Sequence, residues 1–177
     1  MITIWFEAHA TTTDNEAHLA SGWNDVDLSA LGQAQTQQPI PRSKERGIEV
    51  IFTSDLQRAV KTGVPTSNEM RIPIYADHRL RECNYGSLTQ KPKSEVDALK
   101  PNVITTPFPG GESYQECMER IGSFLEYLKE NFDDKTVMVI GHRATQYGLE
   151  HHILGKPILQ CVTDPWQYQP GWKYTLQ

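Results

Sequence analysis

The apolar run at residues 136–140 constrains the fold of this chain more than any other segment. Its sequence, Thr-Val-Met-Val-Ile, shows no alternation of polar and apolar side chains, which is typical of a strand covered on both faces of a parallel sheet. Runs of bulky and β-branched residues at 2–6, 50–54 and 72–75 predict three more strands. Parallel strands need long crossover connections, usually helices, so helices are expected between these runs.

Helical periodicity does occur between the predicted strands. Residues 113–131 form the clearest amphipathic helix, in which apolar residues recur at helical spacing: Cys117, Ile121, Phe124, Leu125 and Leu128. Further helices are predicted over residues 28–35, with Ser29 as the N-cap, and over 55–68 and 142–154. Strands that alternate with helices predict an α/β fold, here a three-layer α/β/α sandwich with a mostly parallel central sheet.

The remaining segments complete a single unit. A length of 177 residues fits one domain over residues 1–177 and is too short for two ordinary ones. Residues 83–111 are rich in Pro, Lys and Gly, and they are predicted to form an irregular surface excursion over the functional face. The tail holds Trp166 and Trp172, whose indoles are expected to pack back onto the domain.

Composition excludes several classes of partner. The net charge of -5 and the pI of about 5.7 provide no basic face, so neither a nucleic acid nor a membrane is expected as a partner. No apolar run approaches the roughly 20 residues of a membrane span, and the opening residues lack the pattern of a signal peptide. Cys83, Cys117 and Cys161 are widely spaced, which argues against a disulfide framework or a metal site. These features predict a protein of the reducing cytoplasm.

Two histidines follow predicted strands at equivalent places. His9 comes shortly after the first strand, and His142 follows the strongest one. A third strand end leads into a helix that carries Arg58, and a loop places Glu82 beside Arg81. Because ligands of open α/β sheets bind at the carboxyl ends of strands, these side chains are expected to face one pocket.

This set of side chains suits phosphoryl transfer without a metal or a cofactor. A neutral imidazole attacks phosphorus and forms a phosphohistidine, which water then hydrolyses. Arginine binds phosphate bidentately and offsets the negative charge on its oxygens. A carboxyl group supplies the proton that the leaving alkoxide needs. The sequence therefore predicts a phosphohydrolase that cleaves a small-molecule phosphate ester.

Five motifs in this chain resemble those of the histidine phosphatase superfamily, in its phosphoglycerate-mutase-like branch. They occur in the family's order over most of residues 1–155: AHATT at 8–12, IFTSDLQRA at 51–59, LRECNYG at 80–86, PGGES at 109–113 and VIGH at 139–142. The resemblance implies the phosphoglycerate-mutase-like sandwich fold and a phosphatase that works through a covalent phosphohistidine.

The resemblance also implies roles for individual residues. His9 would accept the phosphoryl group, and Glu82 would protonate the leaving oxygen. The other residues that the resemblance places at the site are Asn15, Arg58 and His142 around the phosphoryl oxygens, and Ser21 and Gly22 at the substrate entrance.

The chain departs from the family pattern at Ala8, where the family carries an arginine that contacts the phosphate. Loss of one charge-assisted bond weakens phosphate binding by roughly 1.5–3 kcal/mol. Arg143 follows His142 at a position where the family more often has a small residue. We therefore expect the Arg143 guanidinium to occupy the space that Ala8 leaves, which would restore two arginines around the phosphate.

Two alternatives to a phosphatase follow from the same residues. The first is a phosphoglycerate-mutase-type phosphotransferase, which would retain its phosphohistidine. Glycolytic mutases resemble longer chains, however, and the short segment at 83–111 favours access of water and hydrolysis. Lys91 and Lys93 in that segment offer a place for a second anionic group. The second alternative is a pseudoenzyme that binds phosphorylated ligands and has lost activity with Ala8. A monomer and a homodimer are both compatible with the sequence.

Overall fold

The computed structural model describes all residues, 1–177. Its centre is one five-stranded sheet with the strand order β3-β2-β4-β1-β5. The parallel strands are β1 (Ile2–Ala8), β2 (Val50–Thr53), β3 (Ile74–Ala76) and β4 (Thr136–Gly141). The fifth strand, β5 (Trp172–Leu176), pairs antiparallel with β1. β4 lies between β1 and β2 and is buried from Val137 onwards, which explains its apolar sequence. The predicted mostly parallel sheet is confirmed.

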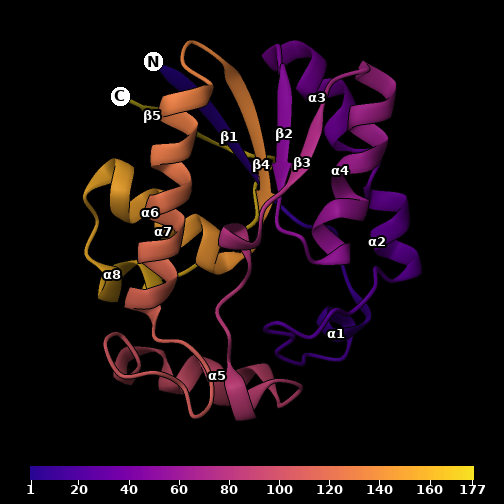
Figure 1. The fold of residues 1–177 in the computed structure, drawn as a ribbon. Coiled ribbons are helices and arrows are strands. Elements are labelled where there is room, and N and C mark those ends of the chain that lie inside the picture. Colours follow the sequence, from indigo (N-terminus) through magenta and orange to yellow (C-terminus); the bar gives the residue numbers. More distant parts are fainter.

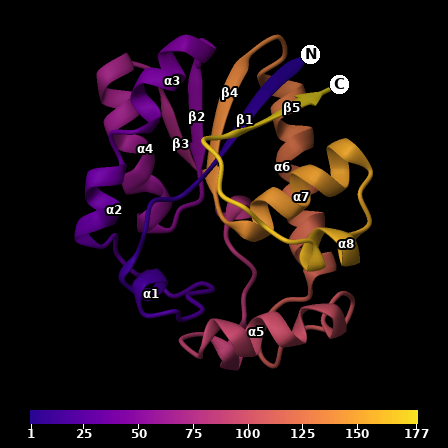
Figure 2. The same ribbon diagram turned by 180° about the vertical axis from the view of Figure 1, so that it is seen from behind.

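Helices cover both faces of this sheet (Figure 1). One layer contains α2 (Ala30–Gln35), α3 (Pro39–Arg46) and α4 (Gln57–Met70). The other contains α6 (Tyr114–Asn131), α7 (Arg143–Leu154) and α8 (Ile158–Thr163). The view from behind shows α1 (Thr13–Glu16) and α5 (Lys93–Leu99) beyond the lower end of the sheet, where the parallel strands end (Figure 2). The predicted three-layer sandwich is therefore confirmed.

Local sequence explains how the main helices begin and pack. The Oγ of Ser113 accepts the backbone N–H of Glu116, and the Glu116 carboxylate accepts the N–H of Ser113, so a capping box starts α6. The apolar face of α6 then packs on the sheet, with the rings of Phe124 and Phe52 5.4 Å apart. Ser29 caps α2 as predicted, because its Oγ accepts the N–H of Gly32.

The helix expected over residues 55–68 starts later than predicted. α4 begins at Gln57, with Leu56 as its N-cap, and continues to Met70. Asp55 lies before the helix instead of in its first turn, and both of its carboxylate oxygens accept hydrogen bonds of 2.7 Å from Arg81. This ion pair fastens the end of β2 to the loop that carries Glu82.

The structure adds elements that the sequence patterns do not reveal. α3 starts at Pro39, which is tolerated there because the first N–H groups of a helix lack partners in any case. The tail forms α8 and β5, and Trp172 packs on Phe6 with a ring separation of 5.7 Å. Trp166 does not pack in the core: it stays 41% exposed beside the cavity described below.

The excursion at residues 83–111 is more ordered than expected. It contains α5 and two short 3-10 turns, η2 (Gly86–Leu88) and η3 (Lys100–Asn102). Its inner side chains, Val96, Val103 and Phe108, are buried in a core shared with α6 and α7. The excursion is thus anchored over the carboxyl ends of the strands. No helix of the chain has both the length and the apolar character that crossing a membrane would require.

Candidate active site

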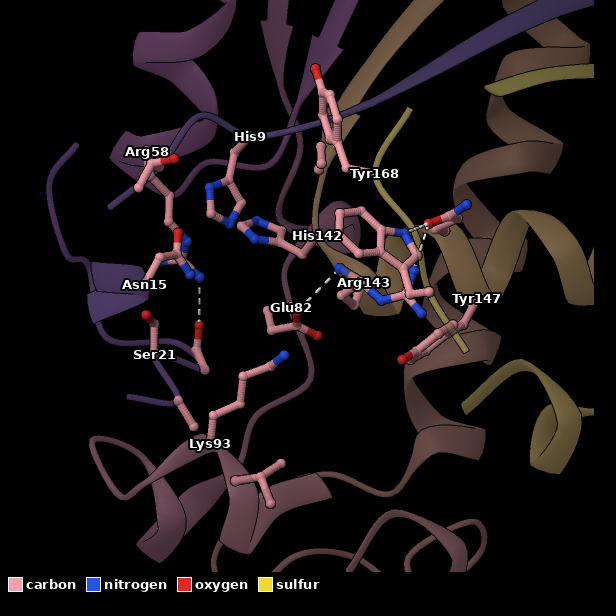
Figure 3. Close-up of a pocket in the computed structure, with 18 of the residues that line it drawn as sticks. His9, Asn15, Ser21, Arg58, Glu82, Lys93, His142, Arg143, Tyr147 and Tyr168 are labelled. Atoms are coloured by element: carbon pink, nitrogen blue, oxygen red, sulfur yellow. Dashed lines mark hydrogen bonds between the residues drawn. The ribbon is translucent and has the colours of Figure 1, made fainter. Parts of the chain in front are cut away.

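The carboxyl ends of three parallel strands meet at a cavity of about 830 Å³. His9 follows β1, Ser54 follows β2 and His142 follows β4, so the sheet brings the three together. Figure 3 shows His9 and His142 side by side, with Glu82 below His142. The cavity is lined by each residue that the sequence placed at the site: His9, Asn15, Ser21, Gly22, Arg58, Glu82, His142 and Arg143.

His9 is held with one ring nitrogen free. Its backbone N–H donates to the carbonyl of Gly141 (3.0 Å), and its Nδ1 lies 2.8 Å from the carbonyl oxygen of Ala10. Because a carbonyl only accepts, Nδ1 carries the proton and Nε2 keeps its lone pair. Burial and the neighbouring Arg58 guanidinium lower the pKa of His9 to about 3. The imidazole is therefore neutral near pH 7, as a nucleophile must be.

His142 stands beside His9, with 5.0 Å between the ring centroids. Its Nε2 lies 2.6 Å from the Oγ of Ser54, and its backbone N–H donates to the Oγ1 of Thr145 at the start of α7. Burial and the Arg58 guanidinium hold the pKa of His142 well below its usual value. The Nδ1 of His142 is buried and has no partner within the protein.

Arg58 reaches the cavity from the first turn of α4 and is only 1% exposed. Its Nη1 donates to the carbonyl of Asn24 (2.9 Å), and its Nη2 donates to the carbonyl of Gly22 (2.8 Å). Its Nε is buried without a partner. An unpaired buried donor costs roughly 1–3 kcal/mol. The Nε of Arg58 and the Nδ1 of His142 are therefore two buried polar atoms without a protein partner, on side chains that line the same cavity.

Glu82 lies against the N-terminus of α7. Its Oε1 accepts the backbone N–H groups of Cys83 (2.8 Å) and Ala144 (3.2 Å), and its Oε2 accepts the N–H of Arg143 (3.2 Å). The Oε2 atom has this single long contact, so it can still exchange a proton with a bound group. Glu82 is held in the cavity wall by backbone groups and not by a basic side chain.

Asn15, Ser21 and Gly22, the residues near the cavity entrance, differ in what they offer to a ligand. Asn15 uses its Oδ1 to cap α1 by accepting the N–H of Thr12 (3.0 Å), which leaves its Nδ2 group available to the cavity. Ser21 donates its hydroxyl to the carboxylate of Asp14 (2.7 Å). Gly22 has a positive φ of 49°, and its carbonyl turns toward Arg58. Ser21 and Gly22 thus shape the wall, whereas Asn15 offers a hydrogen-bond donor.

Arg143 lies in the cavity, but its guanidinium does not occupy the space beside Ala8 that the sequence predicted for it. Its Cζ lies 4.7 Å from the centroid of the Tyr147 ring and 4.9 Å from that of Trp166. Its Nη1 donates to the Oε1 of Gln146 (2.9 Å). In Figure 3 its guanidinium extends on the far side of His142 from His9 and Arg58. The two rings and Gln146 hold the cation away from the end of β1, where Ala8 lines the cavity.

Sequence reasoning missed residues that position the site. Thr62 on α4 accepts the N–H of Ala10 (2.9 Å) and donates to the carbonyl of Arg58 (2.7 Å), so it ties the His9 loop to the helix that carries Arg58. Ser54 belongs to the second motif, but its contact with His142 depends on the neighbouring positions of β2 and β4. Thr62 and Ser54 act through hydrogen bonds to residues of other helices and strands. The sequence around each of them does not indicate which distant residue it will contact.

Arg120 on α6 is the most extensively bonded of these residues. Its guanidinium donates to three consecutive parts of the Glu82 loop, the carbonyls of Arg79 (2.6 Å), Arg81 (2.8 Å) and Glu82 (2.9 Å). Its other N–H groups donate to the carboxylate of Glu112 (3.0 and 3.2 Å), which belongs to the fourth motif. The fourth motif thus supports the Glu82 loop through Arg120.

Cys83, Glu112 and Cys117 bring three possible metal ligands within 4.8 Å of one another. A hydrogen bond that the Cys83 thiol makes with Cys117, together with burial, raises the pKa of this thiol, whereas a metal ligand must be the thiolate. Arg120 already places its positive charge on both oxygens of Glu112. These residues therefore fit a buried structural cluster better than a cation site.

The two histidines predict a pH dependence of stability. In the unfolded chain a histidine protonates near its ordinary pKa of 6.5, whereas folded His9 does so only near 3. The unfolded state therefore binds more protons between these values, and the free energy of unfolding falls as the pH is lowered through this window. Each such histidine contributes a slope of up to roughly 1.4 kcal/mol per pH unit.

We expect His142→Asn to flatten this slope, measured by urea unfolding between about pH 6.5 and pH 4. Asparagine retains a side chain that can bond Ser54 and cap α7. His18→Asn is the matched control, because His18 is exposed and its positive φ of 55° suits asparagine. Equal slopes in wild type and His142→Asn would contradict the prediction.

Comparison with known proteins agrees with this geometry. The sequence matches the family described as histidine phosphatase superfamily (branch 1) over residues 4–165. It is 30% identical over 165 residues to a protein of Escherichia coli named probable phosphoglycerate mutase GpmB, and the match covers 89% of this chain and 77% of that protein.

Solved structures share the fold. YhfR of Bacillus stearothermophilus superposes with a TM-score of 0.83 at 22% identity, covering 96% of this chain and 88% of that one. A mycobacterial glucosyl-3-phosphoglycerate phosphatase in complex with VO3 gives a TM-score of 0.80 at 24% identity, covering 92% and 85%. The motifs, the paired histidines and the family match lead to one conclusion: the chain belongs to the histidine phosphatase superfamily.

Proposed function

We propose that this protein hydrolyses a small phosphate monoester through a covalent phosphohistidine on His9. The observation that carries the proposal is that three side chains with an unpartnered nitrogen, those of His9, Arg58 and His142, line one cavity. The Nε2 of His9 is a free nucleophile, and the Nε of Arg58 and the Nδ1 of His142 are buried without partners. A phosphoryl group would receive the attack of the first and satisfy the other two.

In the first step, the Nε2 lone pair of His9 forms a bond to phosphorus, and the bond from phosphorus to the ester oxygen breaks. Glu82, in its protonated form, gives its proton to the departing oxygen, so an alcohol leaves. Arg58, His142 and the Nδ2 of Asn15 would hold the phosphoryl oxygens as charge builds on them.

In the second step, water attacks phosphorus and the bond from phosphorus to nitrogen breaks. The Glu82 carboxylate now accepts a proton from that water, which returns the site to its starting state and releases inorganic phosphate. His9 leaves as a neutral imidazole because its Nδ1 keeps its proton throughout and donates it in a hydrogen bond to the carbonyl of Ala10.

Hydrolysis is favoured over retention of the phosphohistidine by the size of the cavity. At about 830 Å³ it exceeds what a small phosphate ester fills, so water can reach the intermediate. A phosphoglycerate-mutase-type activity is the second candidate, and the name of the Escherichia coli relative favours it. A pseudoenzyme would bind phosphate at the same donors but would not turn it over.

The test is release of inorganic phosphate from a panel of phosphate monoesters, with and without phosphoglycerate isomers as acceptors. A phosphatase releases phosphate from several esters, whereas a mutase interconverts the isomers and releases little. Tight binding of phosphate or vanadate without any turnover would leave the pseudoenzyme as the function and overturn the proposal.

Because Ala8 stands where the family carries an arginine, we expect the substitution Ala8→Arg to raise the phosphatase activity. Ala8→Arg places a guanidinium at the end of β1, on the same cavity as His9, and adds charge-assisted bonds to the phosphoryl group. We expect kcat/KM for p-nitrophenyl phosphate to rise by about 10- to 100-fold. Ala8→Met is the control for side-chain bulk and should give no rise. No gain with arginine would show that existing donors already saturate the phosphoryl oxygens.

A further inference from the structure

Arg143 is one of two arginines of the cavity that have no acidic partner. Most of the other charged side chains of the cavity are neutralised within the protein. The pairs are Arg42 with Glu7, Lys100 with Asp97 and Asp164 with Lys156. Arg143 instead donates its Nη1 to an uncharged acceptor, the amide oxygen of Gln146. Arg58 is the only other cavity arginine without a carboxylate, and the phosphoryl group accounts for it.

The position of Arg143 is fixed before any ligand binds. Its guanidinium stacks on the rings of Tyr147 and Trp166, 4.7 and 4.9 Å from their centroids. The Oε1 of Gln146 accepts both the Arg143 Nη1 (2.9 Å) and the indole N–H of Trp166 (3.0 Å). Stacking uses the faces of the guanidinium and leaves its remaining N–H edge for an acceptor. Such a fixed cation loses little side-chain entropy when it binds an anion.

The place of Arg143 relative to the reacting atoms indicates which part of a substrate it meets. In Figure 3, Arg58 and Asn15 lie on one side of His142, and Arg143 lies on the other, with Glu82 between them. The leaving oxygen must reach Glu82 to receive its proton. The carbon skeleton behind that oxygen then continues toward Arg143, and the phosphoryl group stays at Arg58.

We propose that Arg143, on the shelf formed by Tyr147, Gln146 and Trp166, binds a second anionic group carried by the leaving alcohol. This inference rests on the proposed phosphatase activity. A carboxylate and a second phosphate both match the planar N–H edge of a guanidinium. The preferred substrates are therefore phosphate monoesters of anionic alcohols, and simple alkyl or aryl phosphates are poorer ones.

The test compares kcat/KM for phosphoglycerate with that for glycerol phosphate, which lacks the carboxylate. A propanediol bisphosphate serves as a third substrate, in which a second phosphate takes the place of the carboxylate. Wild type should prefer the anionic esters, and Arg143→Met should lower the ratio by about 10- to 100-fold, mainly through KM. Arg143→Lys should restore part of the preference, because it keeps the charge but loses the stacking and the fork.

Lys93→Met is the matched control, since Lys93 also lines the cavity but is 63% exposed and lies 3.9 Å from Asp97. It should change the ratio by less than about twofold. If Lys93→Met lowers the ratio and Arg143→Met does not, the second anion binds over α5 and the proposal is wrong. It is equally wrong if Arg143→Met lowers both substrates alike, because Arg143 then acts on the transferred phosphoryl group.

Failure of the proposed function has a different signature. If wild type hydrolyses none of the esters, the proposed phosphatase activity is disproved. The preference is then measured as the ratio of the affinities for phosphoglycerate and glycerol phosphate, determined by calorimetry. A preference for phosphoglycerate that disappears in Arg143→Met supports the anion site even then. Equal binding of the two esters by wild type overturns it.

Discussion

His9→Ala is expected to lower kcat for p-nitrophenyl phosphate by on the order of 10³-fold or more. The ring of His9 presents a neutral Nε2 to the cavity, because its Nδ1 proton is held by the carbonyl of Ala10 and its pKa is lowered to about 3. Alanine leaves no nucleophile at the end of β1. His142 does not take over, since its Nε2 is occupied by Ser54 at 2.6 Å and its Nδ1, as the donor to the phosphoryl group, carries the ring proton.

Trapping of the intermediate gives an independent check on His9. Wild type mixed with substrate and quenched in alkali should carry a phosphoryl group on His9 Nε2, located by mass spectrometry of the peptide. His9→Ala should carry none, yet should still bind vanadate through Arg58 and His142, which shows that the variant is folded. A phosphoryl group on another residue, or full activity of His9→Ala, would disprove the proposed nucleophile.

Glu82→Gln has the second largest expected effect, and its size depends on the leaving group. For alkyl phosphates, whose alkoxide needs a proton, kcat should fall roughly 10²- to 10⁴-fold. For p-nitrophenyl phosphate the fall in the first step should be small, because nitrophenolate leaves without protonation. Glutamine keeps an oxygen to accept the N–H groups at the start of α7, so the loop should stay in place.

Arg120→Lys separates the position of Glu82 from its chemistry. Lysine keeps one positive charge beside Glu112 but cannot hold the carbonyls of Arg79, Arg81 and Glu82 together. Its effect should follow the same dependence on leaving group as Glu82→Gln, and the two substitutions combined should cost less than the sum of the two. Equal losses of kcat/KM, which reports the transfer of the phosphoryl group to His9, on alkyl and nitrophenyl esters in Glu82→Gln would exclude Glu82 as the proton donor.

Much of the fold could be predicted because its signals are local. β4 is apolar throughout because both of its faces are covered, and α6 has one apolar face because it covers the sheet. The candidate site could be predicted for a related reason. His9, Arg58 and His142 each follow a strand, and parallel strands end at one edge.

Weaker local signals account for what was missed. α3 begins with a proline, which usually indicates a break, and β5 is a short edge strand with alternating exposed residues. The excursion at residues 83–111 is full of Pro, Lys and Gly, yet Val96, Val103 and Phe108 bury it against α6 and α7. Such packing involves residues distant in sequence, and so it leaves no periodic pattern in the segment itself.

The sequence by itself determined which residues gather at the carboxyl edge of the sheet, because strand ends and motifs are local properties of the chain. Only the tertiary structure decided how their side chains are used. Arg143 stacks on Tyr147 and Trp166 instead of filling the space at Ala8, because aromatic rings from α7 and from the tail offer its guanidinium a preformed contact. The direction of a long, flexible cation is set by its neighbours in space, and those neighbours exist only once the chain has folded.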